Sequence, residues 1–138
     1  MANYHLTVKN IARAGGKSCV SSLAYRSATK LNDLNTGQSF NYSKKQNVNH
    51  VEILTGDNAP KWLKDIAKEC ISDRQSALQK LSVIFENAEK RKDSQVYREI
   101  EFSLPRELTN EQNIEWSKKF INDVCVKKGM LSVLNFHF

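Results

Sequence analysis

The 138-residue sequence has few of the residues that would mark a disulfide-rich, zinc-binding or membrane protein. Its three cysteines are Cys19, Cys70 and Cys125, an odd number with no CxxC or CxxH spacing, so neither a disulfide framework nor a structural zinc site is indicated. No stretch approaches the roughly 18 apolar residues of a membrane span, and the first ten residues lack the pattern of a signal peptide. We therefore expect one cytoplasmic domain over residues 1–138, with reduced cysteines and no membrane association.

Acidic residues are fewer than basic residues. Lys and Arg number 21 against 15 Asp and Glu, which gives a net charge of +6 and a pI near 9.3. A basic surface is typical of proteins that bind polyanions, most often nucleic acid, although a mildly basic protein without such a partner has the same composition. Hydrophobic residues make up 40% of the chain and are spread along it, so a core can form.

Hydrophobic periodicity predicts strands and helices that alternate along the chain. The expected strands cover 3–9, 50–54, 95–105 and 130–138, with a hairpin over 30–43 that turns at 35–37. The expected helices cover 18–28, a segment that opens at Pro60, a segment capped by Asp73, and 109–127. Thr109 and Gln112 have capping-box spacing, and we expect the inner side of that helix to be lined by Ile114, Trp116, Phe120, Ile121 and Val124. This pattern predicts an α+β fold, an antiparallel-rich sheet with helices packed on its face.

The segment SCVSSLAYRSATK, residues 18–30, places one tyrosine in a run of small residues. On a helix, the neighbours of Tyr25 one turn away are Ser21, Ser22, Ala28 and Thr29. Tyr25 is therefore expected off the apolar stripe, with space around its ring. A partly exposed tyrosine without a role and a nucleophile both fit this pattern.

Two carboxylates share one face of the predicted strand 95–105, because Glu99 and Glu101 are two residues apart. A solvent-facing polar stripe and an acidic site for a metal ion or for acid–base chemistry both fit. His137 lies between Phe136 and Phe138, and it is either a lone histidine or a metal ligand on the same sheet. One histidine is too little for a metal site by itself.

Several stretches together resemble a known family. They are YHLTVKNIARAGGKSCVSSLAYRSATKL, NYSKK with VNHVEIL, APKW, NAEKRKDSQVYREIEFSLPREL and VLNFHF. In order and spacing they resemble the MobA/MobL family of conjugative relaxases, including its TraA-type members, over essentially the whole chain. The resemblance implies a palm-like, HUH-type relaxase domain that nicks one DNA strand at an origin of transfer.

The resemblance also implies roles for individual residues. In such relaxases a tyrosine attacks the scissile phosphate and stays linked to the 5′ end of the DNA, and Tyr25 matches that nucleophile. A divalent ion, Mg²⁺ or Mn²⁺, is held by three histidines, of which His137 matches the first. Glu99 matches an acidic residue that supports the site, and Glu101 is its companion. The implied partners are single-stranded DNA at the origin of transfer and accessory proteins of the relaxosome.

Basic residues near the expected site are candidates for phosphate contacts. They are Arg13, Lys17, Arg26, Lys30, Lys44 and Lys45. For the Lys44–Lys45 pair, a solvated surface without any role is an equal alternative.

The sequence departs from the family at its end. The other two histidines of the family form an H-x-H motif beyond the position of His137, and this sequence has three histidines and no H-x-H. We therefore expect an N-terminal portion of a relaxase domain that binds a divalent ion weakly, is inactive alone and leaves an apolar strand edge exposed around 133–136. The alternatives are a non-catalytic basic module that binds DNA or a partner, and a degenerate gene product.

Overall fold

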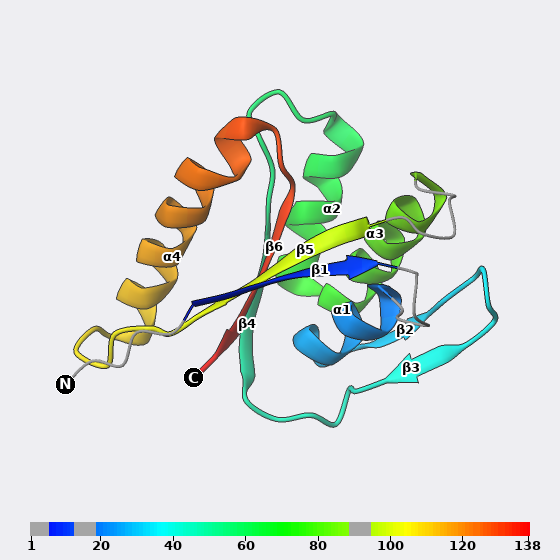
Figure 1. Cartoon of the computed structure of the whole chain (residues 1–138), viewed down its shortest axis with the longest axis horizontal. Coiled ribbons are helices and arrows are strands. Elements are labelled where there is room, and N and C mark those ends of the chain that lie inside the picture. Colours follow the sequence, from blue (N-terminus) through cyan, green and yellow to red (C-terminus); the bar gives the residue numbers. More distant parts are fainter. Residues whose placement is uncertain (1–5, 13–18, 89–94) are drawn as a thin grey trace.

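Four α-helices and six strands appear in the computed structural model, which describes residues 6–12, 19–88 and 95–138 (Figure 1). In chain order the elements are β1 (Leu6–Ala12), α1 (Cys19–Ser27), β2 (Lys30–Asn32), β3 (Ser39–Asn41), β4 (Val48–Leu54), α2 (Lys61–Ser72), α3 (Arg74–Ala88), β5 (Gln95–Phe102), α4 (Asn110–Val124), the short 3₁₀ helix η2 (Val126–Lys128) and β6 (Ser132–His137). Each helix and strand expected from the sequence is present, and the α+β fold class is confirmed.

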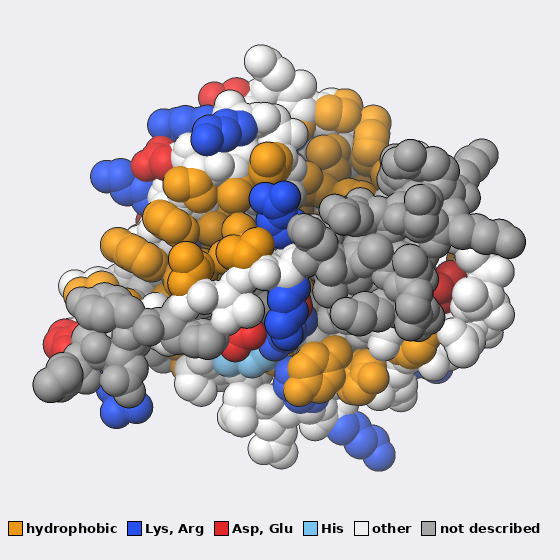
Figure 2. All heavy atoms as spheres, in the orientation of Figure 1, with side chains coloured by type: hydrophobic (Ala, Val, Ile, Leu, Met, Phe, Trp, Pro, Cys, Tyr) orange, Lys and Arg blue, Asp and Glu red, His pale blue; other side chains and the backbone are white. Residues whose placement is uncertain are grey.

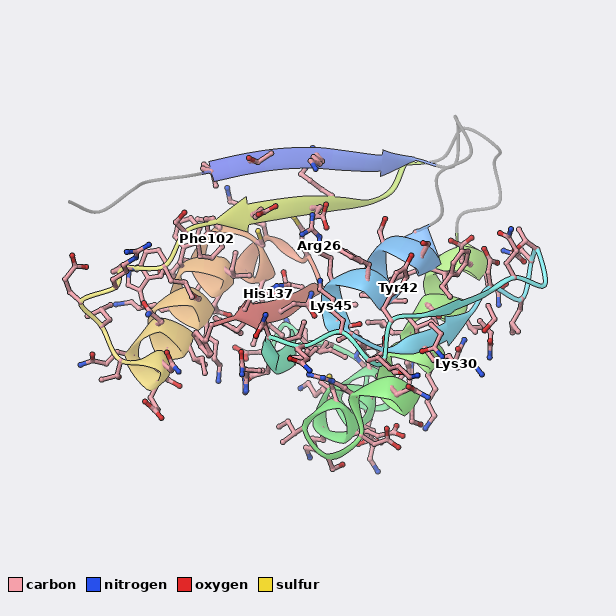
Figure 3. All side chains as sticks on the ribbon, turned by 90° about the horizontal axis from the view of Figure 1, so that it is seen from below. Arg26, Lys30, Tyr42, Lys45, Phe102 and His137 are labelled. Carbon is pink, nitrogen blue, oxygen red and sulfur yellow. The ribbon has the colours of Figure 1, made fainter. Side chains whose placement is uncertain are left out.

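The strands pair as three antiparallel two-stranded sheets in the described ranges, where we expected one layer. β1 pairs with β5, β2 with β3, and β4 with β6. The β1–β5 sheet crosses over the β4–β6 sheet in Figure 1 and lies apart from it, on the outer side, in Figure 3. The expected hairpin is β2–β3, and Gly37 in its turn has a φ of 76°, which glycine adopts without strain.

Two hydrophobic clusters flank the β4–β6 sheet. The larger one joins α1, α2 and α3 to one side of β4 and includes Val20, Leu31, Ile53, Leu78 and Leu81. The smaller one joins α4 and η2 to β6, and partly buried Phe102 of β5 packs against it. Burial on both sides makes β4–β6 the centre of the fold.

The helix ends follow the local sequence. The Thr109 hydroxyl accepts a hydrogen bond from the Gln112 amide at 3.1 Å, and the Gln112 side chain accepts one from the Thr109 amide, so the predicted capping box is confirmed. Asp73 caps α3 by accepting from the Ser76 amide. Gly129, with a φ of 89°, ends η2 in the left-handed conformation.

The inner face of α4 differs from the prediction. Ile121 is buried and Ile114 partly buried, but Trp116, Phe120 and Val124 are exposed. The residues that accompany Ile121 inward are Asn113 and Ser117, at helical spacing of four. The Trp116 and Phe120 rings instead contact Phe102, the last residue of β5, so part of the stripe assigned to the core packs against the end of a strand. Figure 2 shows hydrophobic side chains gathered on this surface over α4.

We expected the apolar residues of the last strand to be exposed, but their side chains are covered. Leu134 and Phe136 are buried in the α4 cluster, and Val133 packs against the larger cluster. The reason is that α4 returns over β6 and covers it. Of the helices in the described part of the chain, none is both long and apolar enough to cross a membrane.

Candidate active site

Tyr25 lies near the C-terminal end of α1, whose end is fixed by hydroxyl groups. The Ser27 hydroxyl donates to the Leu23 carbonyl at 2.6 Å, and it lies 2.8 Å from the Thr29 hydroxyl. Ala28 follows with a left-handed φ of 54° and stops the helix. Because Ala24 on the same turn is buried, the helix is anchored while the Tyr25 side chain remains 45% exposed. The expected placement of Tyr25 off the core face is confirmed.

The space that small neighbours were expected to leave around Tyr25 is partly filled from another segment. The Lys45 Nζ lies 3.6 Å from the centre of the Tyr25 ring and donates a hydrogen bond to the Tyr25 carbonyl oxygen at 3.1 Å. The Tyr42 ring meets the Tyr25 ring edge to face, with centres 5.3 Å apart. One side of the nucleophile candidate is therefore covered.

Arg26, the next residue, faces β5. Its Nε donates to Glu99 Oε1 at 2.6 Å, and its Nη2 lies 3.6 Å from Glu101 Oε2. Burial lowers the pKa of Arg26, but the hydrogen bond with Glu99 and the charges of both glutamates outweigh it, and the net pKa is raised. The two glutamates share the face of β5 that looks toward α1, as their spacing predicted.

His137 reaches the same place from the end of β6. Figure 3 shows it between α4 and α1, close to Lys45 and below Arg26. Burial and the nearby charge of Lys45 lower the pKa of His137, and they prevail over a hydrogen bond with the Arg26 backbone and the charge of Glu101, which act the other way. Its imidazole is therefore neutral at pH 7.

The structure thus links the candidate residues through Arg26 and Lys45. Arg26 pairs with the two glutamates of β5, Lys45 lies over the Tyr25 ring, and both cations adjoin His137 of β6. Lys44 is exposed beside Lys45. Lys30 is exposed at the start of β2 and lies away from the cluster in Figure 3. Arg13 and Lys17 lie outside the described residues, so their predicted contacts stay predictions.

Comparison with known proteins decides the family. A model of the MobA/MobL family matches residues 17–138. The chain belongs to the MobA/MobL family. It is 32% identical, over 99% of its length, to the conjugal transfer protein TraA of Agrobacterium fabrum, and 35% identical to the mobilization protein MobL of Acidithiobacillus ferridurans. It spans only 12% of the former and 32% of the latter.

A solved structure supports the same assignment at the level of the fold. The structure titled "Molecular Basis of Vancomycin Resistance Transfer in Staphylococcus aureus" is 34% identical to this chain. It superposes with a TM-score of 0.78 over 99% of this chain and 63% of the other. The resemblance drawn from the sequence is therefore confirmed, and it extends to the arrangement of helices and strands.

The donors expected for a metal ion in a MobA/MobL protein are incomplete here. Within residues 6–12, 19–88 and 95–138, no group of three or more His, Cys, Asp or Glu side chains is arranged to hold one. Glu99 is engaged by Arg26, and His137 has Lys45 and Arg26 as cationic neighbours. These residues do not make a site for Mg²⁺ or Mn²⁺ without further ligands, and that cofactor stays a prediction.

One polar cluster of this MobA/MobL chain was missed by sequence reasoning. His50 and Glu52 of β4 approach to 2.9 Å, and Lys118 of α4 reaches the other Glu52 oxygen at 2.8 Å. Burial raises the pKa of Glu52, but hydrogen bonds from Lys118 and His50 outweigh it and the net pKa is lowered. The i, i+2 spacing of His50 and Glu52 was the available signal, whereas Lys118 is 66 positions from Glu52 in the chain and gave none.

Proposed function

We propose that this chain is the nucleophile-bearing part of a conjugal-transfer relaxase that nicks single-stranded DNA at an origin of transfer. The shared neighbours of Tyr25, Glu99, Glu101 and His137 carry the proposal. Arg26 adjoins the Tyr25 ring and pairs with both glutamates, and Lys45 adjoins both Tyr25 and His137, so three distant segments gather around the tyrosine. The names of the TraA and MobL relatives support a role in conjugal transfer and mobilization.

The reaction assigned to Tyr25 is a transesterification. The Tyr25 Oη forms a bond to the scissile phosphorus, and the bond from phosphorus to the 3′ oxygen breaks. The phenol loses its proton, and the departing oxygen takes one up to become a 3′ hydroxyl. The DNA is left attached through a 5′ phosphotyrosine, and reversal of the same step rejoins the strand.

The surrounding residues suit the approach of a polyanion. The exposed Lys44 lies beside Lys45 in this segment, and the whole chain carries a net charge of +6, which favours binding of a polyanion. The phosphate contact predicted for Arg26 stays a prediction, and Glu99 and Glu101 balance its charge. We assign Arg26 to holding α1 against β5, so that the nucleophile keeps its place.

His137 contributes a neutral ring. A neutral imidazole carries one N–H and one lone pair, and the lowered pKa of His137 keeps that lone pair available at pH 7. The Arg26 backbone and the charge of Lys45 act on the pKa of His137, so the ring lies beside the end of α1. His137 is therefore suited to ligate a cation or to hold a proton. A bound divalent ion would supply charge stabilisation at the phosphate oxygens.

The test is covalent capture. The chain is incubated with single-stranded origin-of-transfer oligonucleotides and Mg²⁺ or Mn²⁺, and denaturing gels are read for a protein–DNA adduct. The incomplete metal donors led us to expect an inactive chain, but with Tyr25 exposed beside Arg26 and Lys45 we now expect an adduct that forms slowly. It should map by peptide mass to Tyr25 and be lost in Tyr25→Phe with oligonucleotide binding retained. An adduct that persists in Tyr25→Phe would refute the assignment.

A second candidate, a DNA-binding module without chemistry, is favoured by one observation: the described residues do not complete a metal site. It predicts oligonucleotide binding without any adduct, equal in the wild-type chain and in Tyr25→Phe. The same gels and a binding titration separate the two functions.

A further inference from the structure

We propose that Lys45, together with Tyr42, positions the Tyr25 ring for attack, so that Lys45 acts on the nucleophile and not as a ligand of DNA phosphate. The inference rests on the proposed function of Tyr25. It assigns a role that its place in the Lys44–Lys45 pair did not suggest.

Lys45 contacts Tyr25 twice. Its ammonium lies over the ring at 3.6 Å from the centre, within the range of a cation–π contact, and donates to the backbone carbonyl of the same residue at 3.1 Å. Two contacts from one ammonium to one residue fix the ring relative to its own backbone. Burial, and to a smaller extent the charge of Arg26, lowers the pKa of Lys45, which agrees with an ammonium held against protein.

The segment that carries these two side chains is itself tied to the end of α1. The Tyr42 amide donates to the Thr29 carbonyl at 3.0 Å, and the Lys45 amide donates to the Tyr42 carbonyl at 3.0 Å. Asn41 closes the turn by accepting from the Ser43 amide. Because two of these bonds join backbone to backbone and the third holds the turn between them, Tyr42 and Lys45 are presented to Tyr25 in a fixed relation.

Tyr42 and Lys45 together contact the Tyr25 ring and leave part of it exposed to solvent. Tyr42 meets the ring at a near-perpendicular angle of 88°, and Lys45 covers a face, yet Tyr25 remains 45% exposed. The nucleophile is thus restrained on the protein side and accessible from solvent. Restraint of this kind raises the rate of attack, since a misplacement of about 1 Å can cost on the order of a hundredfold.

The neighbouring lysine provides the contrast. Lys44 is exposed, and its side chain has no hydrogen bond or ion pair among those resolved in the described residues. The consecutive lysines therefore face different surroundings, and we expect Lys44→Met to act mainly by weakening the binding of DNA. Lys45→Met keeps an unbranched side chain, shorter than that of lysine by the terminal nitrogen, and removes its charge and donors.

The experiment compares Lys45→Met, Lys45→Arg and a control, Lys68→Met, which removes an exposed charge from α2. Adduct formation is measured at saturating oligonucleotide, and affinity separately by fluorescence anisotropy. We expect Lys45→Met to slow adduct formation about tenfold or more, with affinity within about twofold of wild type, and Lys45→Arg to restore most of the rate. Lys68→Met should match wild type in both.

A second measurement does not depend on activity. In the NMR spectrum, the Lys45 ε-methylene protons should be shifted upfield by the Tyr25 ring, and Tyr25→Leu should remove the shift. If no upfield shift is seen, the contact of Lys45 with the Tyr25 ring is refuted, whatever the activity. If Lys45→Met binds the oligonucleotide more weakly but forms the adduct at an unchanged saturating rate, the positioning role is also refuted and Lys45 is a phosphate ligand. An upfield shift in a wild-type chain that binds the oligonucleotide and forms no adduct would favour the binding module as the function of this chain, and it would leave the contact of Lys45 with the Tyr25 ring standing.

Discussion

Two antiparallel sheets of similar length lie near each other in this fold, and they are used in opposite ways. In β4–β6, side chains on both faces are buried, Val51 and Ile53 in one cluster and Leu134 and Phe136 in the other. In β1–β5, Leu6 and Val8 are 67% and 54% exposed. Their partners across the sheet, Phe102 and Ile100, are partly buried.

The inner sheet, β4–β6, contributes mainly to stability, and the outer sheet, β1–β5, carries charged residues of the candidate site. The sheet buried on both faces holds the helices together. Among the described side chains of the outer sheet, Phe102 packs against the smaller cluster and Glu99 pairs with Arg26. The outer sheet can carry charged side chains on the face that meets Arg26, since desolvation there is incomplete.

The largest expected effect is on the inner sheet. Phe136→Ala should reduce the free energy of unfolding by about 3–5 kcal/mol, because the ring is buried and the cavity would not close fully. Leu6→Thr on the outer sheet should change it by less than about 0.5 kcal/mol. Urea unfolding of both variants measures the contrast, and equal losses would show that the outer sheet is as tightly packed in solution as the inner one.

A smaller effect is expected where α1 is attached to the outer sheet. Glu99→Gln removes the charge that partners Arg26, and we expect a loss of about 1–2 kcal/mol, between the values for exposed and for buried pairs. Asp123→Asn, which breaks the exposed pair with Lys127 within α4, is the matched control and should cost about 0.5 kcal/mol or less. A double-mutant cycle with Arg26→Met isolates the pair, and a coupling near zero would refute its role as an attachment.

The smallest effect is a pH dependence of the inner sheet. The folded pKa of Glu52 lies below its unfolded value of 4.5, so its stabilising contribution is complete above pH 4.5 and is lost as the pH falls through the folded pKa. Glu52→Gln should therefore unfold with a shallower dependence on pH in this acidic window. Thermal melts between neutral and acidic pH measure it, and parallel curves for the two proteins would contradict the prediction.

Local pattern was sufficient for the elements and for the faces of the strands. The alternation of Glu99 and Glu101 placed both on one side of β5, and the capping box placed the start of α4 at Thr109. Periodicity did not predict which residues of α4 are buried, because Trp116 and Phe120 are apolar yet stack with each other beside Phe102 and stay exposed. An apolar stripe indicates which side of a helix faces other elements, but not how deeply each side chain is buried.

The candidate site was predictable as a set of residues and not as a set of contacts. Tyr25, Glu99 and His137 were identified from residue type, spacing and family resemblance. The engagement of Arg26 by Glu99 and the approach of Lys45 to the Tyr25 ring were not, because each joins segments whose proximity exists only after folding. Both contacts engage a predicted phosphate ligand with another part of the protein.

The Arg26–Glu99 pair joins residues that are 73 positions apart, and this distance has a consequence for the order of events during synthesis. Closing a loop of that size is a slow step compared with forming a helix. α1 is therefore synthesised long before β5 exists to meet it, and during this interval Arg26, next to Tyr25, has neither of its glutamate partners. A growing chain carries the proposed nucleophile without its surroundings, and the surface that we assign to DNA is assembled only when the last third of the sequence has been made.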